Sequence, residues 1–124
     1  MYNQQLTVSA SAVRAATNSS VVYENTQPKS YRGLHLVFDI TVAPGVDTVT
    51  LKIEGYDTTS GKYYDILVGA ALSTVGTNTM RVYPSQVAAA NVAVSDCLPS
   101  AWRVTVTHSA ATNFTYSVGA TLLG

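Results

Sequence analysis

Charged side chains are scarce in this chain of 124 residues. Seven Lys and Arg and seven Asp and Glu make up 11% of the residues and cancel to a formal net charge of zero, whereas typical domains carry about 25% charged residues. A nucleic-acid binder needs a basic stripe that displaces phosphate counterions, and a polybasic membrane anchor needs clustered Lys and Arg. The composition therefore disfavours both partners. A surface of Ser, Thr, Asn, Ala and Tyr costs little to desolvate and suits protein–protein contact.

Cysteine and long apolar runs are also nearly absent. Cys97 is the single cysteine, which excludes an internal disulfide and a cysteine-based zinc site, and we expect it to be a small buried thiol. No stretch approaches the roughly 18 apolar residues of a membrane helix. Residues 1–5 lack a basic region followed by an apolar run. We therefore expect a protein made in the cytoplasm, unless a leader has been removed.

Apolar side chains recur at every second position along most of the chain, which is the period of a β-strand with one buried face. Residues 34–42 and 48–54 follow this pattern on either side of the turn cluster 43–47, so we predict that they form a β-hairpin. Further strands are predicted over 63–72 and 77–83. Two more follow after residue 100. The predicted inward side chains are Leu34, Leu36, Phe38, Ile40, Val42, Val49, Leu51, Ile53, Tyr64, Ile66, Val68, Ala70, Leu72, Met80, Val82, Trp102, Val104, Val106, His108, Phe114, Tyr116, Val118, Ala120 and Leu122.

Two segments are less regular. Residues 85–99 break the period, and we predict a short helical turn over 86–90, capped by Ser85 and stopped by Asn91, within a crossover between sheets. In the first thirty residues, apolar side chains alternate from Leu6 to Ala12, and a short strand is expected at Val21 and Tyr23. Residues 1–30 are accordingly predicted to form an N-terminal strand and a contact arm.

Seven to eight short strands separated by Gly, Pro and Ser turns indicate an all-β protein. We predict one domain over residues 1–124, an antiparallel β-sandwich or jelly roll. One apolar face on each strand, rather than continuous apolar runs, argues against a parallel α/β sheet.

The residues that could carry catalysis do not form a recognisable motif. Asp39 and Glu54 are expected to face each other on the solvent side near Lys52, and a metal site would need His35, His108 and Asp39 together. His108 is predicted to point inward, away from such a site. We therefore predict no catalytic residues, no metal and no cofactor. Four tyrosines are candidates for stacking on sugars: Tyr56, Tyr63, Tyr64 and Tyr83.

Several segments together resemble a group of small β-rich proteins encoded among the virion genes of tailed bacteriophages. The resemblance covers about residues 31–124 and contains no catalytic motif. It is carried by Tyr31-Arg32-Gly33-Leu34-His35-Leu36-Val37-Phe38-Asp39-Ile40-Thr41, Ser60-Gly61-Lys62-Tyr63-Tyr64, Gly76-Thr77, Arg81-Val82-Tyr83-Pro84, Trp102-Arg103-Val104-Thr105-Val106-Thr107-His108 and Tyr116-Ser117-Val118-Gly119.

This resemblance implies a non-enzymatic structural protein located in the virion. By analogy with other small phage sandwiches, we expect a head decoration (cement) protein that binds the major capsid protein and copies of itself, with a homotrimer favoured. Tyr and Arg dominate interface hot spots, and the interface candidates are Tyr2, Tyr23, Tyr31 and Arg32. The alternatives are a tail or baseplate component and a carbohydrate-binding β-sandwich module.

Overall fold

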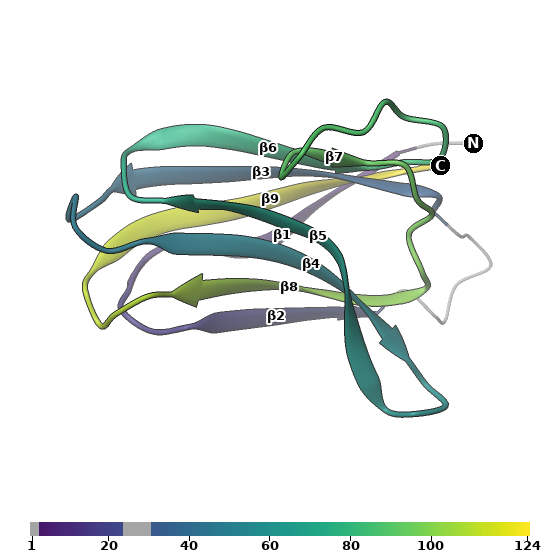
Figure 1. The fold of residues 1–124 in the computed structure, drawn as a ribbon, viewed down its shortest axis with the longest axis horizontal. Coiled ribbons are helices and arrows are strands. Elements are labelled where there is room, and N and C mark those ends of the chain that lie inside the picture. The colour runs from purple at the N-terminus through teal and green to yellow at the C-terminus, as the bar shows by residue number, and fades with distance from the viewer. Residues whose placement is uncertain (1–2, 24–30) are drawn as a thin grey trace.

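The fold consists of β-strands and connecting loops (Figure 1). The computed structural model describes residues 3–23 and 31–124, and for residues 18–23 it describes the backbone. These ranges contain no helix, and hence none that could cross a membrane. The strands are β1 (Gln4–Arg14), β2 (Asn18–Tyr23), β3 (Gly33–Val42), β4 (Val49–Asp57), β5 (Lys62–Leu72), β6 (Gly76–Val82), β7 (Ala93–Val94), β8 (Ala101–His108) and β9 (Phe114–Leu123).

Two sheets pack face to face. The strand order is β1-β9-β3-β6-β7 in a five-stranded sheet and β2-β8-β4-β5 in a four-stranded sheet. All strand pairs within the described residues are antiparallel except β6 with the two-residue β7. Apart from β7, the eight long strands pair first with last, second with second-last, and so on to β4 with β5. This nested pairing is the topology of a jelly roll. The predicted all-β sandwich is confirmed.

The core lies between the two sheets. It confirms most of the predicted inward faces, because alternate residues of β3, β4, β8 and β9 are buried. Trp102 is fully buried, and its Nε1 has no hydrogen-bond partner among the described residues. The largest fully buried side chains are Trp102, Tyr116, Phe38, Phe114, Leu34, Leu36, Ile40, Leu51, Ile53, Leu122, Val49 and Val82.

The predicted hairpin of residues 34–42 and 48–54 is wrong. These segments form β3 and β4, which belong to different sheets, and the connection between them crosses from one sheet to the other. At this crossing Val42 is exposed rather than inward, after a register shift between Ile40 and Val42. Alternation identifies a buried face, but the same pattern arises whether the next strand pairs alongside or packs opposite.

The predicted inward face of β5 is also partly wrong. Ile66 and Leu72 pack against the core, but Tyr64, Val68 and Ala70 are exposed. Two register shifts against β4 are the cause: extra residues on β5 switch its inward parity, so that Leu67 and Gly69 are buried instead. Beyond the shifts the β4–β5 hairpin bends away from the rest of the sandwich (Figure 1).

The crossover after β6 is confirmed, since β6 and β7 lie in one sheet and β8 in the other. The helical turn predicted within it is absent from the described residues. Ser85 and Asn91 have φ of 65° and 64°. A helix N-cap has φ and ψ in the β region, so Ser85 cannot cap a helix here. Cys97, expected to be buried, is exposed.

The N-terminal strands are found near their predicted positions, as β1 and the backbone of β2. Leu6 and Val8 pack against the core as expected, but Ala10 and Ala12 are exposed. Register shifts between Thr7 and Ser9 and between Ser9 and Ala12 break the alternation on this edge strand.

Candidate functional site

The outer face of the five-stranded sheet is the surface that turns away from the core. Its residues on β3, β6 and β9 alternate with buried ones. Small polar side chains dominate it, with Val37 among them at 37% exposure. The residues of this face are His35, Val37, Asp39, Thr77, Thr79, Arg81, Thr115, Ser117, Gly119 and Thr121. Such a face combines a low desolvation cost with an apolar centre.

A hollow of about 370 Å³ lies beside Val37 on this face. Its base is Gly119, where an added Cβ would find no atom within 4 Å. His35, Thr121 and Gln5 line its sides. A glycine in the middle of a paired strand opens room for a close approach from outside, so the hollow can receive a side chain of a docked protein.

A second hollow of about 330 Å³ shares His35 with the first. Arg81 and Tyr83 line it, and Arg81 pairs directly with His35 across β3 and β6. Burial, followed by the charge of Arg81, holds the pKa of His35 below its ordinary value of 6.5. His35 is therefore neutral at neutral pH, and its Nε2 is buried without a partner among the described residues.

Little net charge remains on this face. Of the residues that β3, β6 and β9 place there, His35, Asp39 and Arg81 are the ionisable ones. Asp39 Oδ1 accepts a hydrogen bond of 3.0 Å from Thr77 Oγ1. The centre of the face, around Val37 and Gly119, is thus uncharged and exposed.

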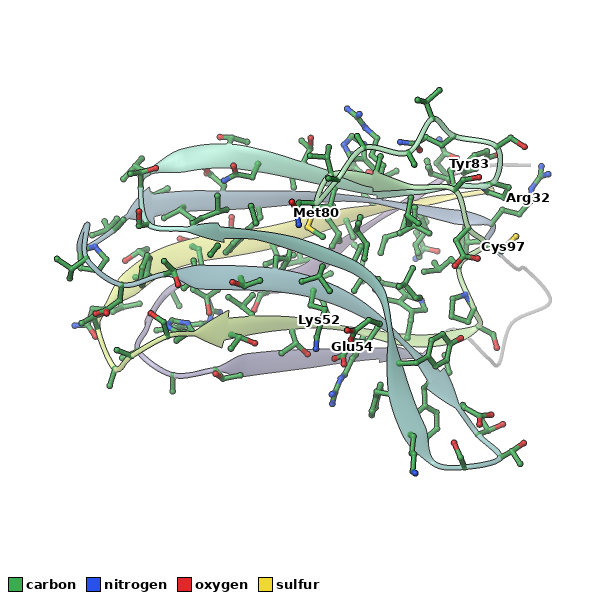
Figure 2. All side chains as sticks on the ribbon, viewed as in Figure 1. Arg32, Lys52, Glu54, Met80, Tyr83 and Cys97 are labelled. Carbon is green, nitrogen blue, oxygen red and sulfur yellow. The ribbon has the colours of Figure 1, made fainter. Side chains whose placement is uncertain are left out.

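The opposite outer face, on the four-stranded sheet, carries a charged cluster (Figure 2). Glu54 accepts hydrogen bonds from Arg103 and Thr105, and Lys52 lies between the carboxylates of Glu54 and Asp65. The expectation that Asp39 faces Glu54 is wrong, because β3 and β4 belong to different sheets and turn these residues to opposite outer faces. The expected proximity of Glu54 to Lys52 is confirmed, at 3.5 Å.

The histidines do not meet. His35 lies on the outer face of the five-stranded sheet, whereas His108 Nε2 is 2.9 Å from the hydroxyl of buried Tyr116. The described residues hold no group of three His, Cys, Asp or Glu side chains that could bind a metal.

The tyrosines proposed for sugar stacking are divided between two places. Tyr56, Tyr63 and Tyr64 lie on the projecting β4–β5 hairpin, where the rings of Tyr56 and Tyr63 are tilted by 49° at 4.8 Å. The guanidinium of Arg103 covers the Tyr63 ring at 3.6 Å. Tyr83 follows β6 in the other sheet and packs on Gly33.

Of the interface candidates, the structure places Tyr31 and Arg32 together just before β3. The Tyr31 hydroxyl donates a hydrogen bond of 2.6 Å to Gln4 Oε1. Arg32 is exposed, and its backbone bonds to Leu123 and Leu98. Tyr2 and the side chain of Tyr23 lie outside the described residues. Sequence reasoning missed the hollow, although an apolar Val37 among polar neighbours and a glycine within a predicted strand could have indicated it.

No protein-family model matches the chain, and no curated protein matches its sequence.

Proposed function

We propose that the protein is a non-enzymatic assembly module that binds other proteins through the outer face of its five-stranded sheet. The observation that carries the proposal is the uncharged centre of this face, where exposed Val37 adjoins the hollow at Gly119. Interface cores are depleted of charge and closely packed. An exposed apolar residue beside a hollow provides one knob and one hole for such packing.

The particular role that we propose is a structural protein of a tailed-phage virion: a head decoration protein on the outer capsid surface. Three points support it: the resemblance of residues 31–124, the jelly-roll topology that also occurs in viral capsid domains, and the scarcity of charge. Many equivalent copies on a lattice convert modest affinity into high avidity. A homotrimer would match a three-fold position of that lattice.

The test is co-sedimentation of the purified protein with capsids assembled without it. Val37→Glu should abolish binding, because the variant buries a charge with no partner at the centre of the interface. Val46→Glu is the matched control: Val46 is 77% exposed in the β3–β4 connection, and its variant should bind like the wild type.

Three outcomes each contradict one part of this proposal. Failure of the wild type to bind capsids contradicts the head assignment, and labelling of tails in particle images would favour the tail or baseplate alternative. Equal binding by the Val37→Glu and Val46→Glu variants contradicts the choice of face. Sedimentation equilibrium tests the trimer, and a monomeric mass at all concentrations overturns it.

A further inference from the structure

A cleft opens between β5 and β6 on the side of the sandwich where both sheets end. Its volume is about 360 Å³, and it reaches down to the core residues Phe38, Leu51 and Met80. Met80 projects from β6 toward β5 (Figure 2), and its sulfur would lie 3.1 Å from a Cβ placed on Gly69. The thioether is flexible and can repack around a guest side chain.

Among the described residues, the cleft is lined without any ionisable side chain. Its walls include the small residues Gly69, Ala70, Thr77, Thr79 and Ala90, and none of its lining residues is Asp, Glu, Lys, Arg or His. A charged guest would lose its hydration and gain no compensating ion pair. Because the lining carries no charge, the cleft favours an uncharged guest with small side chains.

The edge of β6 along the cleft has backbone groups that pair with none of the described residues. The N–H of Arg81 donates to Val92 O, which shows that the peptide groups of Arg81 point away from β3. Thr79 and Thr77 follow at two-residue intervals in the same antiparallel register with β3, so their N–H and C=O groups point the same way. β7 pairs only with Arg81 and Val82, and no other described strand pairs with this edge.

The loop before β7 closes one end of the cleft. Asn91, held at a φ of 64°, donates a side-chain hydrogen bond of 3.0 Å to Val68 O on the free edge of β5. Val68 and Val92 are left 40% and 39% exposed around this contact. The side-chain amide thus substitutes for one hydrogen bond that a further strand would make.

We propose that this cleft binds an extended, uncharged segment of a partner polypeptide, which adds as a strand to β6. The backbone of the segment pairs with Thr77 and Thr79, and alternate small apolar side chains enter the cavity above Met80 and Leu51. An apolar small molecule would fill the cavity but leave the peptide groups of β6 buried and unpaired. The cleft shares Thr77 and Thr79 with the outer face of the five-stranded sheet, but neither Val37 nor Gly119 lines it, so either proposal can fail alone.

The test is selection of a displayed library of random octapeptides on the immobilised folded protein. We expect enrichment of peptides without Asp, Glu, Lys or Arg that carry small apolar residues at alternate positions. Thr79→Pro removes one free N–H, and Ala90→Trp fills the cleft from its exposed wall. Each substitution should lower the affinity for the best synthetic peptide by about tenfold or more, which is the effect of one lost hydrogen bond.

Ala88→Trp is the matched control, since Ala88 is exposed on the same loop and does not line the cleft. It should bind the peptide like the wild type. A second readout is amide hydrogen exchange of the wild type, in which the peptide should slow exchange at Thr77 and Thr79. This measurement keeps the test valid if Thr79→Pro does not fold.

Three results would overturn the proposal. One is the absence of any enriched peptide. Another is an enriched peptide that binds the Ala90→Trp variant as tightly as the wild type and leaves exchange at Thr77 and Thr79 unchanged. The third is self-association of the wild type that Ala90→Trp abolishes, because it would assign the cleft to a second copy of this chain.

Discussion

The carboxylate of Glu54 on β4 accepts a hydrogen bond of 2.7 Å from Nε of Arg103 on the adjacent strand β8. The same oxygen accepts a second hydrogen bond, of 3.0 Å, from Thr105 Oγ1. Lys52 Nζ lies 3.5 Å from the other carboxylate oxygen. Glu54 is only 5% exposed. Burial by itself raises the pKa of Glu54, but the hydrogen bonds and charges of Arg103, Thr105 and Lys52 outweigh it and hold the pKa below its ordinary value of 4.5.

Glu54→Gln should lower the free energy of unfolding by about 1–2 kcal/mol at pH 7, since it removes the charge that pairs with Arg103 and Lys52. Because the pKa is lower in the folded state, the unfolded state binds more protons near pH 4, and the contribution is lost as the pH falls through the folded pKa. Urea unfolding at pH 7 and pH 3 should therefore show a smaller difference between wild type and variant at pH 3. An equal difference at both values would contradict the ion-pair explanation.

The two histidines predict a second pH dependence. Burial is the main cause that holds the pKa of both histidines below 6.5. The second cause is the charge of a nearby arginine, which is Arg81 for His35 and Arg14 for His108. The unfolded chain binds these protons at a higher pH than the folded one, so stability should fall as the pH drops below about 6.5. In thermal unfolding between pH 7.5 and 5.5, the double variant His35→Gln and His108→Gln should lose most of this slope. A slope as steep as that of the wild type would assign it to other groups.

The single tryptophan offers a test of core packing. Trp102→Ala should lower the free energy of unfolding by about 3–5 kcal/mol, because it leaves a large cavity between the sheets. Trp102→Phe should cost well under half of that, since the indole N–H makes no hydrogen bond among the described residues. Chemical denaturation measures both losses, and equal losses would contradict the expectation that the lost side-chain volume sets the cost. Tyr116→Phe, which deletes a hydroxyl 2.9 Å from His108 Nε2, should cost about 1 kcal/mol as a control.

Two glycines should respond differently to the same added methyl group. In Gly33→Ala the new Cβ would meet the ring of Tyr83 and, at 2.6 Å, the backbone oxygen of Val82, which cannot move without disturbing β6. In Gly55→Ala it would meet the end of the exposed Tyr64 side chain, which can swing away. We expect Gly33→Ala to cost about 2 kcal/mol or more and Gly55→Ala under about 1 kcal/mol. Thermal unfolding of both variants provides the comparison, and a reversed order would contradict it.

The candidate site could be predicted only in part from the amino-acid sequence. Val37 could be placed on the polar face of its strand, next to His35 and Asp39. Its position beside Gly119 depends on the register of β3 with β9, which alternation does not encode. The cleft depends in turn on where β5 and β6 diverge, and the two shifts on β5 that switch its parity have no sequence signature in this chain.

The amino-acid pattern by itself determined that the protein is built of strands, and which side chains of residues 34–40, 49–53, 102–106 and 114–122 face inward. It did so because burial of one face selects side chains at a period of two. The tertiary structure alone decided that 34–42 pairs with β6 and β9 rather than with 48–54, and that a hollow and an open edge remain. Strand partners are joined by backbone hydrogen bonds that every residue type can make, so the choice among them depends on the whole fold.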